Sequence, residues 1–406
     1  MTLQTTPPDR VSSQVRSARI NRRPPGFAAV LIALAIIFAL AWMFFVRSGS
    51  SVPTPETNGI KGTYSWQAAG AVGQKGDFSA VSAGNASGST RTQAVTSPGA
   101  VAPASAYEAA TRTETTYTGK GIGRLERVVG AWPPVWLVAT RSPLDYQGLS
   151  AIVRAAVEDG DHSVGIKPLK QGDRTVWRAA MRMDGKVIDV VVDQQAGIVS
   201  WYSDGEQTFS ASVDWASPPP AGTTYSVDAP AGTPVKTATS DGYTYAASPG
   251  AAGRTAGYEP LVSDLAPDGY GLKAVATITD GYRPLDWLHV GPSAPPTMTP
   301  LPVVLQLYTR GLSWFTAEQV KSEAMKTLAP GLDELLANVK DTQLSYQETT
   351  LQYGAFKGRT ASTWYQDSGP SLYVAGARRA VFVTGALTRQ ELIAYAEGLK
   401  PAPAEL

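Results

Sequence analysis

The chain has 406 residues, of which 43% are hydrophobic and 17% are charged, and its formal net charge is +1. A net charge so close to zero provides no field for attracting nucleic acid, so we expect no nucleic-acid partner. The absence of cysteine from the sequence excludes disulfides, a cysteine nucleophile and a lipid-modified cysteine. The sequence holds only two histidines and no cysteine, so we expect no metal site. It also has no dinucleotide-binding fingerprint and no phosphate-binding loop, and we expect no cofactor.

The first predicted element is a run of twenty uncharged residues, Phe27–Val46. At about 1.5 Å of rise per residue, a helix of this length spans the roughly 30 Å hydrocarbon core of a bilayer. Five arginines precede the run, and the positive-inside rule therefore places residues 1–26 in the cytoplasm and the rest of the chain outside. We expect a single-pass protein of the cell membrane. The alternative is a cleaved signal peptide, whose apolar region is usually only about 7–15 residues long.

After a Ser- and Pro-rich tether, residues 57–216 are expected to form the first of two exported domains. The beginning of this domain is rich in Gly, Ala, Ser and Thr. Short strands are expected at Tyr64–Trp66 and Asp77–Val81, followed by a loop over residues 82–105. Further along, Leu149–Val157 has the pattern of a short amphipathic helix.

The clearest β pattern runs from Trp177 to Trp215, where apolar and polar residues alternate along four successive strands joined by turns such as Asp184-Gly185. This alternation is typical of an antiparallel sheet with one solvated face. The apolar face is the candidate ligand groove, and its members are Trp177, Met181, Met183, Ile188, Val190, Val192, Phe209, Val213 and Trp215. If the helix at Leu149–Val157 covers this face only in part, room is left for an acyl chain or an apolar segment. If the helix covers it fully, the face is an ordinary core.

Residues 217–260 are rich in Pro, Gly, Thr and Ala, and we expect them to link the two domains. Residues 261–400 are expected to form a smaller α+β domain. Its predicted strands are Leu272–Thr279, Pro302–Tyr308, Gln347–Phe356, Arg359–Tyr365, Ser371–Ala375 and Arg379–Gly385.

Two capping-box patterns predict helices in this second domain. Thr316 and Gln319 form the first pattern, which predicts that a helix begins there. Thr388 and Glu391 form the second pattern, immediately before a final helix that is expected to end before Pro401.

The sequence contains no recognisable catalytic motif, such as a G-x-S-x-G elbow or a phosphate-binding loop. Asp189 and Asp193 lie on the polar side of a predicted strand, where we expect both to be solvated. We therefore assign no catalytic and no metal-binding residues. Because carboxylate pairs form in space rather than in sequence, an unrecognised cell-envelope enzyme that uses Asp and Glu stays open as an alternative.

The run from Trp177 to Trp215 resembles the sheet of the lipoprotein-carrier (LolA-like) superfamily, and within it the large domain of the MucB/RseB sigma-factor regulatory proteins. The segments APDGYGL at 266–272, VVLQLYTRGLSWFT at 303–316 and VFVTGALTRQELIAYAEGL at 381–399 resemble the small domain of that family. The resemblance implies a LolA-like half-barrel with helices, followed by a smaller α+β domain. Together with the helix predicted from Phe27–Val46, we therefore expect an α+β protein in which a single N-terminal transmembrane helix precedes these two domains.

The sequence departs from the family pattern in three places. It carries the membrane segment Phe27–Val46, and the first 60 or so exported residues show little apolar alternation. In addition, Arg310 stands where the family often has an acidic residue before the glycine.

Members of the family are non-catalytic, and they bind lipid-like molecules, lipoproteins or the exported segment of an anti-sigma factor. The resemblance therefore implies a protein that is not an enzyme and that senses or binds an apolar ligand, a lipoprotein or an envelope-stress (anti-sigma) regulator. With the anchor predicted from Phe27–Val46, we expect it to be membrane-anchored and extracytoplasmic. One alternative is a lipoprotein or cell-envelope lipid carrier, and others are the unrecognised enzyme and a purely structural module. The expected partners are the membrane, a lipid or lipoprotein ligand, and an anti-sigma factor or other membrane protein.

Overall fold

The computed structural model describes residues 59–71, 73–82, 90–95, 104–108, 111–117, 123–130, 146–172, 174–183, 185–193, 197–215, 227, 229–239, 243–278, 302–322, 340 and 343–402. They belong to one compact unit, Ser51–Leu406, which is distinct from Met1–Ser50. In these ranges no helix is long and apolar enough to cross a membrane. The expected anchor, Phe27–Val46, lies outside the described residues.

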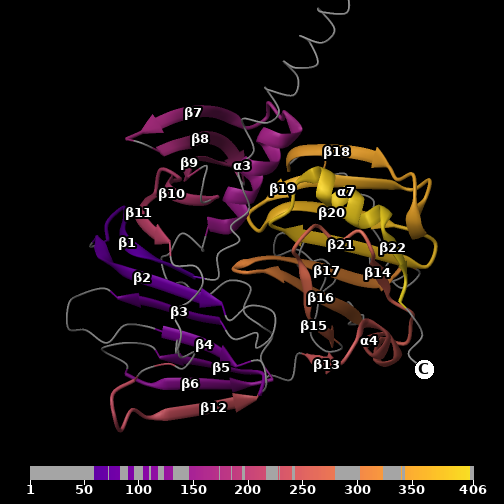
Figure 1. Cartoon of the computed structure of the whole chain (residues 1–406), viewed down its shortest axis with the longest axis horizontal. Coiled ribbons are helices and arrows are strands. Elements are labelled where there is room, and N and C mark those ends of the chain that lie inside the picture. The colour runs from indigo at the N-terminus through magenta and orange to yellow at the C-terminus, as the bar shows by residue number, and fades with distance from the viewer. Residues whose placement is uncertain are drawn as a thin grey trace, which may run out of the picture. The chain divides into compact units, whose positions relative to one another are not determined.

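The described part of the chain is mostly β, and its largest element is a twelve-stranded sheet (Figure 1). Neighbouring strands are antiparallel except for the first two in the spatial order, which are parallel. In that order the strands are β12 (Val235–Thr239), β6 (Leu125–Val129), β5 (Thr113–Tyr117), β4 (Ala104–Glu108), β3 (Thr90–Val95), β2 (Gln74–Ser82), β1 (Gly59–Ala68), β11 (Gln207–Trp215), β10 (Ile198–Ser203), β9 (Lys186–Asp193), β8 (Arg174–Met183) and β7 (Gly165–Gln171).

The four alternating strands predicted between Trp177 and Trp215 are confirmed as β8 to β11, each antiparallel to the next. Gly185 and Gly205 lie in the turns between them with φ of 77° and 85°, a left-handed backbone that favours glycine. The strands expected near Trp66 and Phe78 are also confirmed, within β1 and β2. The edge strand β7 was not predicted, because most of its side chains are exposed and show no apolar alternation.

The loop predicted over residues 82–105 is wrong for part of its length, since β3 and the start of β4 lie within it. β3 pairs with β2 on one side and with β4 on the other. Its residues, TRTQAV, lack the apolar alternation that marks a strand with one buried face. Threonine and valine nevertheless favour extended backbone, and pairing on both sides supplies hydrogen bonds that composition does not reveal.

Helix α3 (Gln147–Asp159) confirms the amphipathic helix predicted at Leu149–Val157. It ends at Gly160, whose φ of 66° and backbone N–H complete the last turn. The helix lies against β9 and β10 of the first sheet and against a strand of the second sheet. It therefore contacts both sheets.

The second sheet has eight strands and is accompanied by a two-stranded sheet, β14 (Leu261–Ser263) with β22 (Leu399–Pro401). Its order is β13 (Thr244–Ala246), β15 (Gly271–Ile278), β16 (Val303–Arg310), β17 (Ser313–Lys321), β21 (Arg379–Gly385), β20 (Gly369–Ala375), β19 (Thr360–Gln366) and β18 (Leu344–Thr350). Helices α4 (Pro249–Ala256) and α7 (Arg389–Glu397) and the short 3-10 turn η3 (Gly354–Phe356) accompany these strands. The residues expected to form a linker, 217–260, thus contain β12, β13 and α4, and the division into domains stays a prediction.

The helix predicted to begin at Thr316 is wrong, because these residues form the central strand β17. β17 pairs with β16 on one side and with β21 on the other. The side chain of Gln319 does not cap a helix but binds the backbone of Leu261, from whose N–H it accepts at 2.7 Å and to whose carbonyl it donates at 2.6 Å. Pairing on both sides and this buried contact outweigh a local capping pattern.

The capping box predicted for the last helix is confirmed in α7. The Glu391 N–H donates to Thr388 Oγ1 at 3.1 Å, and the Thr388 N–H donates to Glu391 Oε2 at 2.7 Å. Leu387 and Leu392 are fully buried in the core of the second sheet, as expected for residues that flank a cap of this kind. The N-terminus of α7 is therefore fixed both by hydrogen bonds and by apolar packing.

We expect Thr388→Ala to lower the free energy of unfolding by about 0.5–2 kcal/mol, because it removes the hydroxyl that accepts the Glu391 N–H. Chemical denaturation of the full chain in detergent measures this change. Gln390→Ala is the matched control, since Gln390 is exposed on the first turn of the same helix. Equal midpoints for Thr388→Ala and the wild type would show that the cap does not stabilise the fold.

Candidate functional site

The structure brings eight of the nine predicted groove residues together in one core. Each of the eight side chains is at most 7% exposed. The ninth, Trp215, belongs to β11, and its side chain lies outside the described residues. The eight are Trp177, Met181, Met183, Ile188, Val190, Val192, Phe209 and Val213.

Helix α3 covers this apolar face. Leu149, Ile152, Val153, Ala155 and Ala156 of the helix belong to the same core as the eight strand residues. In this structure a ligand can therefore reach the face only if α3 moves. The buried indole N–H of Trp177 has no hydrogen-bond partner among the described residues, so it is available to a polar atom of a ligand.

Aromatic rings close the end of this core where α3 begins. The ring of Tyr146, the residue before α3, stacks on Tyr202 with centroids 4.7 Å apart and lies 4.9 Å from the ring of Phe209. Burial raises the pKa of Tyr202 to about 12, so its hydroxyl stays protonated even in alkaline solution where an exposed tyrosine would ionise. Tyr146 thus ties the start of the helix to β10 and β11.

Polar side chains of α3 form hydrogen bonds with the second sheet and with helix α7. Arg154 is buried, and its Nη2 donates to the carbonyl of Ala386 at 2.7 Å and to Glu391 Oε2 at 3.2 Å. The Gln147 amide donates to the carbonyl of Leu312 at 2.9 Å. At Gly148 a Cβ atom would lie 1.9 Å from the carbonyl oxygen of Asp367, so only glycine fits there.

A second buried arginine, Arg389 at the start of α7, completes this contact from the other side. Its Nη2 donates to the Ser345 carbonyl at 2.8 Å and lies 3.4 Å from Asp161 Oδ2, and its Nε donates to Thr363 Oγ1 at 3.1 Å. Asp161 also accepts a hydrogen bond from the Ser345 hydroxyl. Each of the two buried guanidiniums therefore has an acidic partner.

Burial raises the pKa of Asp159 at the end of α3, although the Arg389 guanidinium, 3.8 Å away, opposes the shift. Asp159 Oδ2 accepts no hydrogen bond from the described residues. Burial also raises the pKa of Glu158. Because the folded chain holds these two protons more tightly than the unfolded chain does, their contribution to stability grows as the pH falls toward the raised pKa values. It is lost as the pH rises through them.

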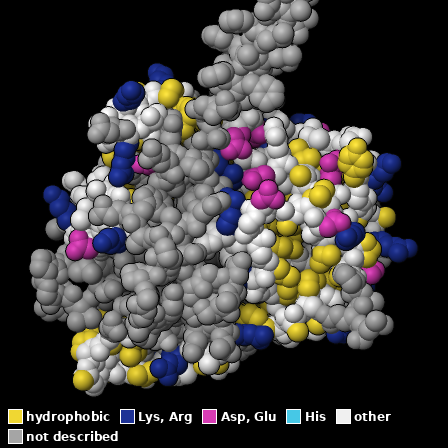
Figure 2. Space-filling model, in the orientation of Figure 1, with side chains coloured by type: hydrophobic (Ala, Val, Ile, Leu, Met, Phe, Trp, Pro, Cys, Tyr) yellow, Lys and Arg dark blue, Asp and Glu magenta, His cyan; other side chains and the backbone are white. Residues whose placement is uncertain are grey.

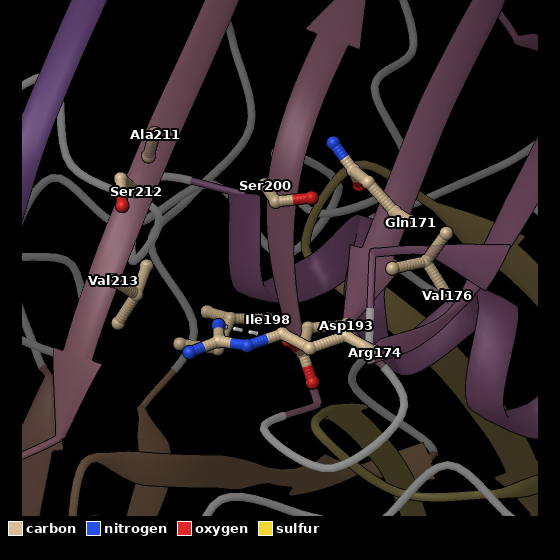
Figure 3. Close-up of a pocket in the computed structure, with 9 residues that line it drawn as sticks. All are labelled: Gln171, Arg174, Val176, Asp193, Ile198, Ser200, Ala211, Ser212 and Val213. Atoms are coloured by element: carbon tan, nitrogen blue, oxygen red, sulfur yellow. Dashed lines mark hydrogen bonds and ion pairs between the residues drawn. The ribbon is translucent and has the colours of Figure 1, made fainter.

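Sequence reasoning missed a cavity of about 280 Å³ at one end of β8 to β11 (Figure 3). Of the eight groove residues whose side chains the structure describes, Val213 alone lines it. The lining combines apolar side chains with hydroxyls, an amide and an ion pair, and consists of Gln171, Arg174, Val176, Asp193, Ile198, Ser200, Ala211, Ser212 and Val213.

The two aspartates that we expected to be solvated differ from each other. Asp189 accepts a hydrogen bond of 3.1 Å from the exposed Arg178, as a surface pair does. Asp193, by contrast, is buried and pairs with Arg174 at 3.3 Å, so the expectation is wrong for this residue. Sequence alternation places a residue on one side of a strand, but it does not show whether distant parts of the chain bury that side.

The described residues include no group of three or more His, Cys, Asp and Glu side chains placed to hold a metal ion. On the face shown in Figure 2, basic and acidic side chains are interspersed over the described surface, without a large patch of one sign. The described part of this face therefore provides no strong electrostatic field of one sign that would attract a charged partner.

No family model matches the chain, and no curated protein matches it. Among solved structures it is similar to MucB in complex with MucA(peri), with 12% sequence identity, 86% of this chain and 94% of that chain covered, and a TM-score of 0.27. For the MucA/MucB complex of Pseudomonas aeruginosa, the identity is 12%, the coverage is 86% and 95%, and the TM-score is 0.26. For PNGF-II the identity is 8%, the coverage is 54% and 40%, and the TM-score is 0.23. TM-scores of this size carry no argument for a function.

We expect Met181→Trp to lower the free energy of unfolding by about 1–3 kcal/mol, because Met181 is 3% exposed and its surroundings are filled by α3. Arg182→Trp is the control, since Arg182 is exposed on the opposite side of the same strand. The measurement combines chemical denaturation with the affinity of an apolar fluorescent probe. Unchanged stability, together with displacement of a bound probe, would show that the face is an open groove.

Proposed function

We propose that this chain is a membrane-anchored extracytoplasmic binding protein whose partner is the exported segment of a membrane-bound envelope-stress regulator of the anti-sigma class. In this proposal Phe27–Val46 spans the membrane, the N-terminus is cytoplasmic and the bulk of the chain lies outside. The resemblance of the sequence to the MucB/RseB proteins supports the choice of partner. One structural observation supports a sensing role, namely that α3 covers the apolar face of the first sheet and also binds the second sheet and α7.

The two sides of α3 cannot move independently, because they belong to one short helix. Ile152 and Val153 are fully buried in the core of the first sheet. We call the twelve-stranded sheet the first module, and the eight-stranded sheet with α4 and α7 the second module. Arg154, the residue after Val153, donates to the Ala386 carbonyl and to Glu391, both in the second module. A ligand that displaces the helix from the apolar face therefore has to break or shift the Arg154 contacts.

In this proposal an apolar ligand binds to the apolar face of the first sheet, under α3. Met181 and Met183 line the face under α3, and methionine adapts its shape to different apolar ligands. Occupation of the face by an acyl chain would displace α3 and alter the surface that the second module offers to the regulator. A lipid or lipoprotein carrier would use the same face without a regulator as partner.

Chemical crosslinking of the full chain in its native membranes, followed by mass spectrometry, tests the proposal. We expect the crosslinked partner to be a membrane protein whose exported segment, added as a synthetic peptide, competes with the crosslink. Arg154→Gln should reduce capture of this partner, whereas Arg182→Gln on the exposed side of β8 should not. Both variants are compared after circular dichroism has shown that they are folded.

Other outcomes would contradict parts of the proposal. Co-purification of lipids or lipoproteins without any membrane-protein partner would favour the carrier. A mature N-terminus at residues 49–51, with the protein released from the membrane fraction, would exclude the anchor and favour a cleaved signal peptide.

A further inference from the structure

The first sheet opens between two neighbouring strands. β10 and β11 pair only at Trp201–Ser210, Tyr202–Phe209 and Ser203–Thr208. Beyond these pairs, β10 stays paired with β9 and β11 stays paired with β1. A register shift between Val199 and Trp201 places a bulge at Ser200, where the strands part. Among the described strands, Ala211–Val213 therefore has no ladder partner on the β10 side.

The cavity of about 280 Å³ lies at this opening and includes residues from the sheet face that α3 does not cover. Val176, Asp193 and Ile198 are directly opposite one another on β8, β9 and β10, so they share one face. Trp177 and Val192, one position along, share the other face and pack in the core with α3. The cavity thus borders the core under α3, with which it shares Ile198 and Val213, but most of its lining lies outside that core.

The chemistry of the cavity is divided between its floor and its mouth. Val176, Ile198 and Val213 are buried and make the floor apolar. At the mouth, the Arg174 side chain is 53% exposed and its Nη1 lies 3.3 Å from Oδ2 of Asp193, whose side chain is 10% exposed. Figure 3 shows the guanidinium extended over the cavity beside Ile198. A guanidinium has five donors, so the pair with Asp193 fixes Arg174 and leaves donors for an anion.

We infer that this cavity, called the cleft from here on, binds the C-terminal end of an extended peptide whose last residue is small and apolar. The terminal carboxylate pairs with Arg174, and the peptide main chain bonds to the open edge of β11 at Ala211–Val213. The last side chain rests on the apolar floor. Strand addition at an open edge supplies main-chain hydrogen bonds, while pockets beside the edge select side chains.

Other ligand classes fit this cleft less well. An acyl chain would offer no acceptor to the remaining donors of Arg174 at the mouth. A metal cation would meet a guanidinium and a single carboxylate, which is too few ligands for a site. The volume of about 280 Å³ is at the lower limit of ligand pockets, about 300–1,000 Å³, so the bound end is small.

Binding of the tripeptide Ala-Ala-Ala to the full chain in detergent, measured by calorimetry, tests this inference against its C-terminal amide. We expect the free acid to bind roughly tenfold more tightly than the amide, because only the acid pairs with Arg174. Arg174→Gln should remove this difference. Arg182→Gln should preserve it, since Arg182 is an exposed arginine on the same face of the same strand, outside the cavity lining.

A second pair of variants separates blockage of the cleft from a change in folding. Ser212 lines the cavity and is exposed, so Ser212→Trp should abolish tripeptide binding without disturbing the core. Ser210→Trp places the same ring two residues away on the same strand and should leave binding intact. Failure of the wild type to bind the acid, equal affinities for acid and amide, or equal effects of the two tryptophans would each overturn the inference.

This inference goes beyond the proposed function, because the charged pair and the open strand edge on which it depends, Arg174 with Asp193 and Ala211–Val213 of β11, take no part in the covering of the sheet by α3. If the tripeptide does not bind but the membrane partner is still crosslinked, only this inference fails. If the tripeptide binds as expected but no membrane partner is captured, only the proposed function fails.

Discussion

The packing of α3 between two modules is the constraint on which the rest of this structure depends. The helix buries Ile152 and Val153 in the core of the first sheet, and burial of each such side chain contributes about 1.5–3 kcal/mol. The next residue, Arg154, is 6% exposed, so its charge must be neutralised by partners. Those partners, the Ala386 carbonyl and Glu391, come from the second module. The backbone of α3 can approach the backbone of Asp367 closely because Gly148 has no side chain.

Glu391 connects this contact to the local stability of α7. A single oxygen, Oε2, accepts from the Thr388 N–H at 2.7 Å and from Arg154 Nη2 at 3.2 Å. The carboxylate also lies at the N-terminus of α7, where the helix dipole favours negative charge. The Ala386 carbonyl, two residues before the cap, accepts from both Arg154 and the Tyr270 hydroxyl. A displacement of α3 is therefore transmitted to the start of α7 through hydrogen bonds that also hold that helix in place.

Local patterns were sufficient to predict some elements but not others. The meander of β8 to β11 and the cap at Thr388 were predictable, because alternation and capping depend on neighbouring residues. β17 was not, since a buried central strand depends on its two partner strands and on the contact between Gln319 and Leu261. Eight groove residues were correctly placed on one face. Their closure by α3, the parting of β10 and β11 and the burial of Asp193 depend on contacts between distant segments, which a single sequence does not encode as a pattern.

Hydrogen–deuterium exchange of the full chain in detergent, with Ile152→Ala compared with the wild type, tests most directly whether α3 couples the two modules. The substitution leaves a cavity under α3 in the first sheet and touches none of the polar contacts of Arg154. We predict faster exchange in α7 and β20 of the second module as well as in β8 to β11, because α3 contacts both modules. Faster exchange confined to the first sheet, with α7 and β20 unchanged, would contradict it.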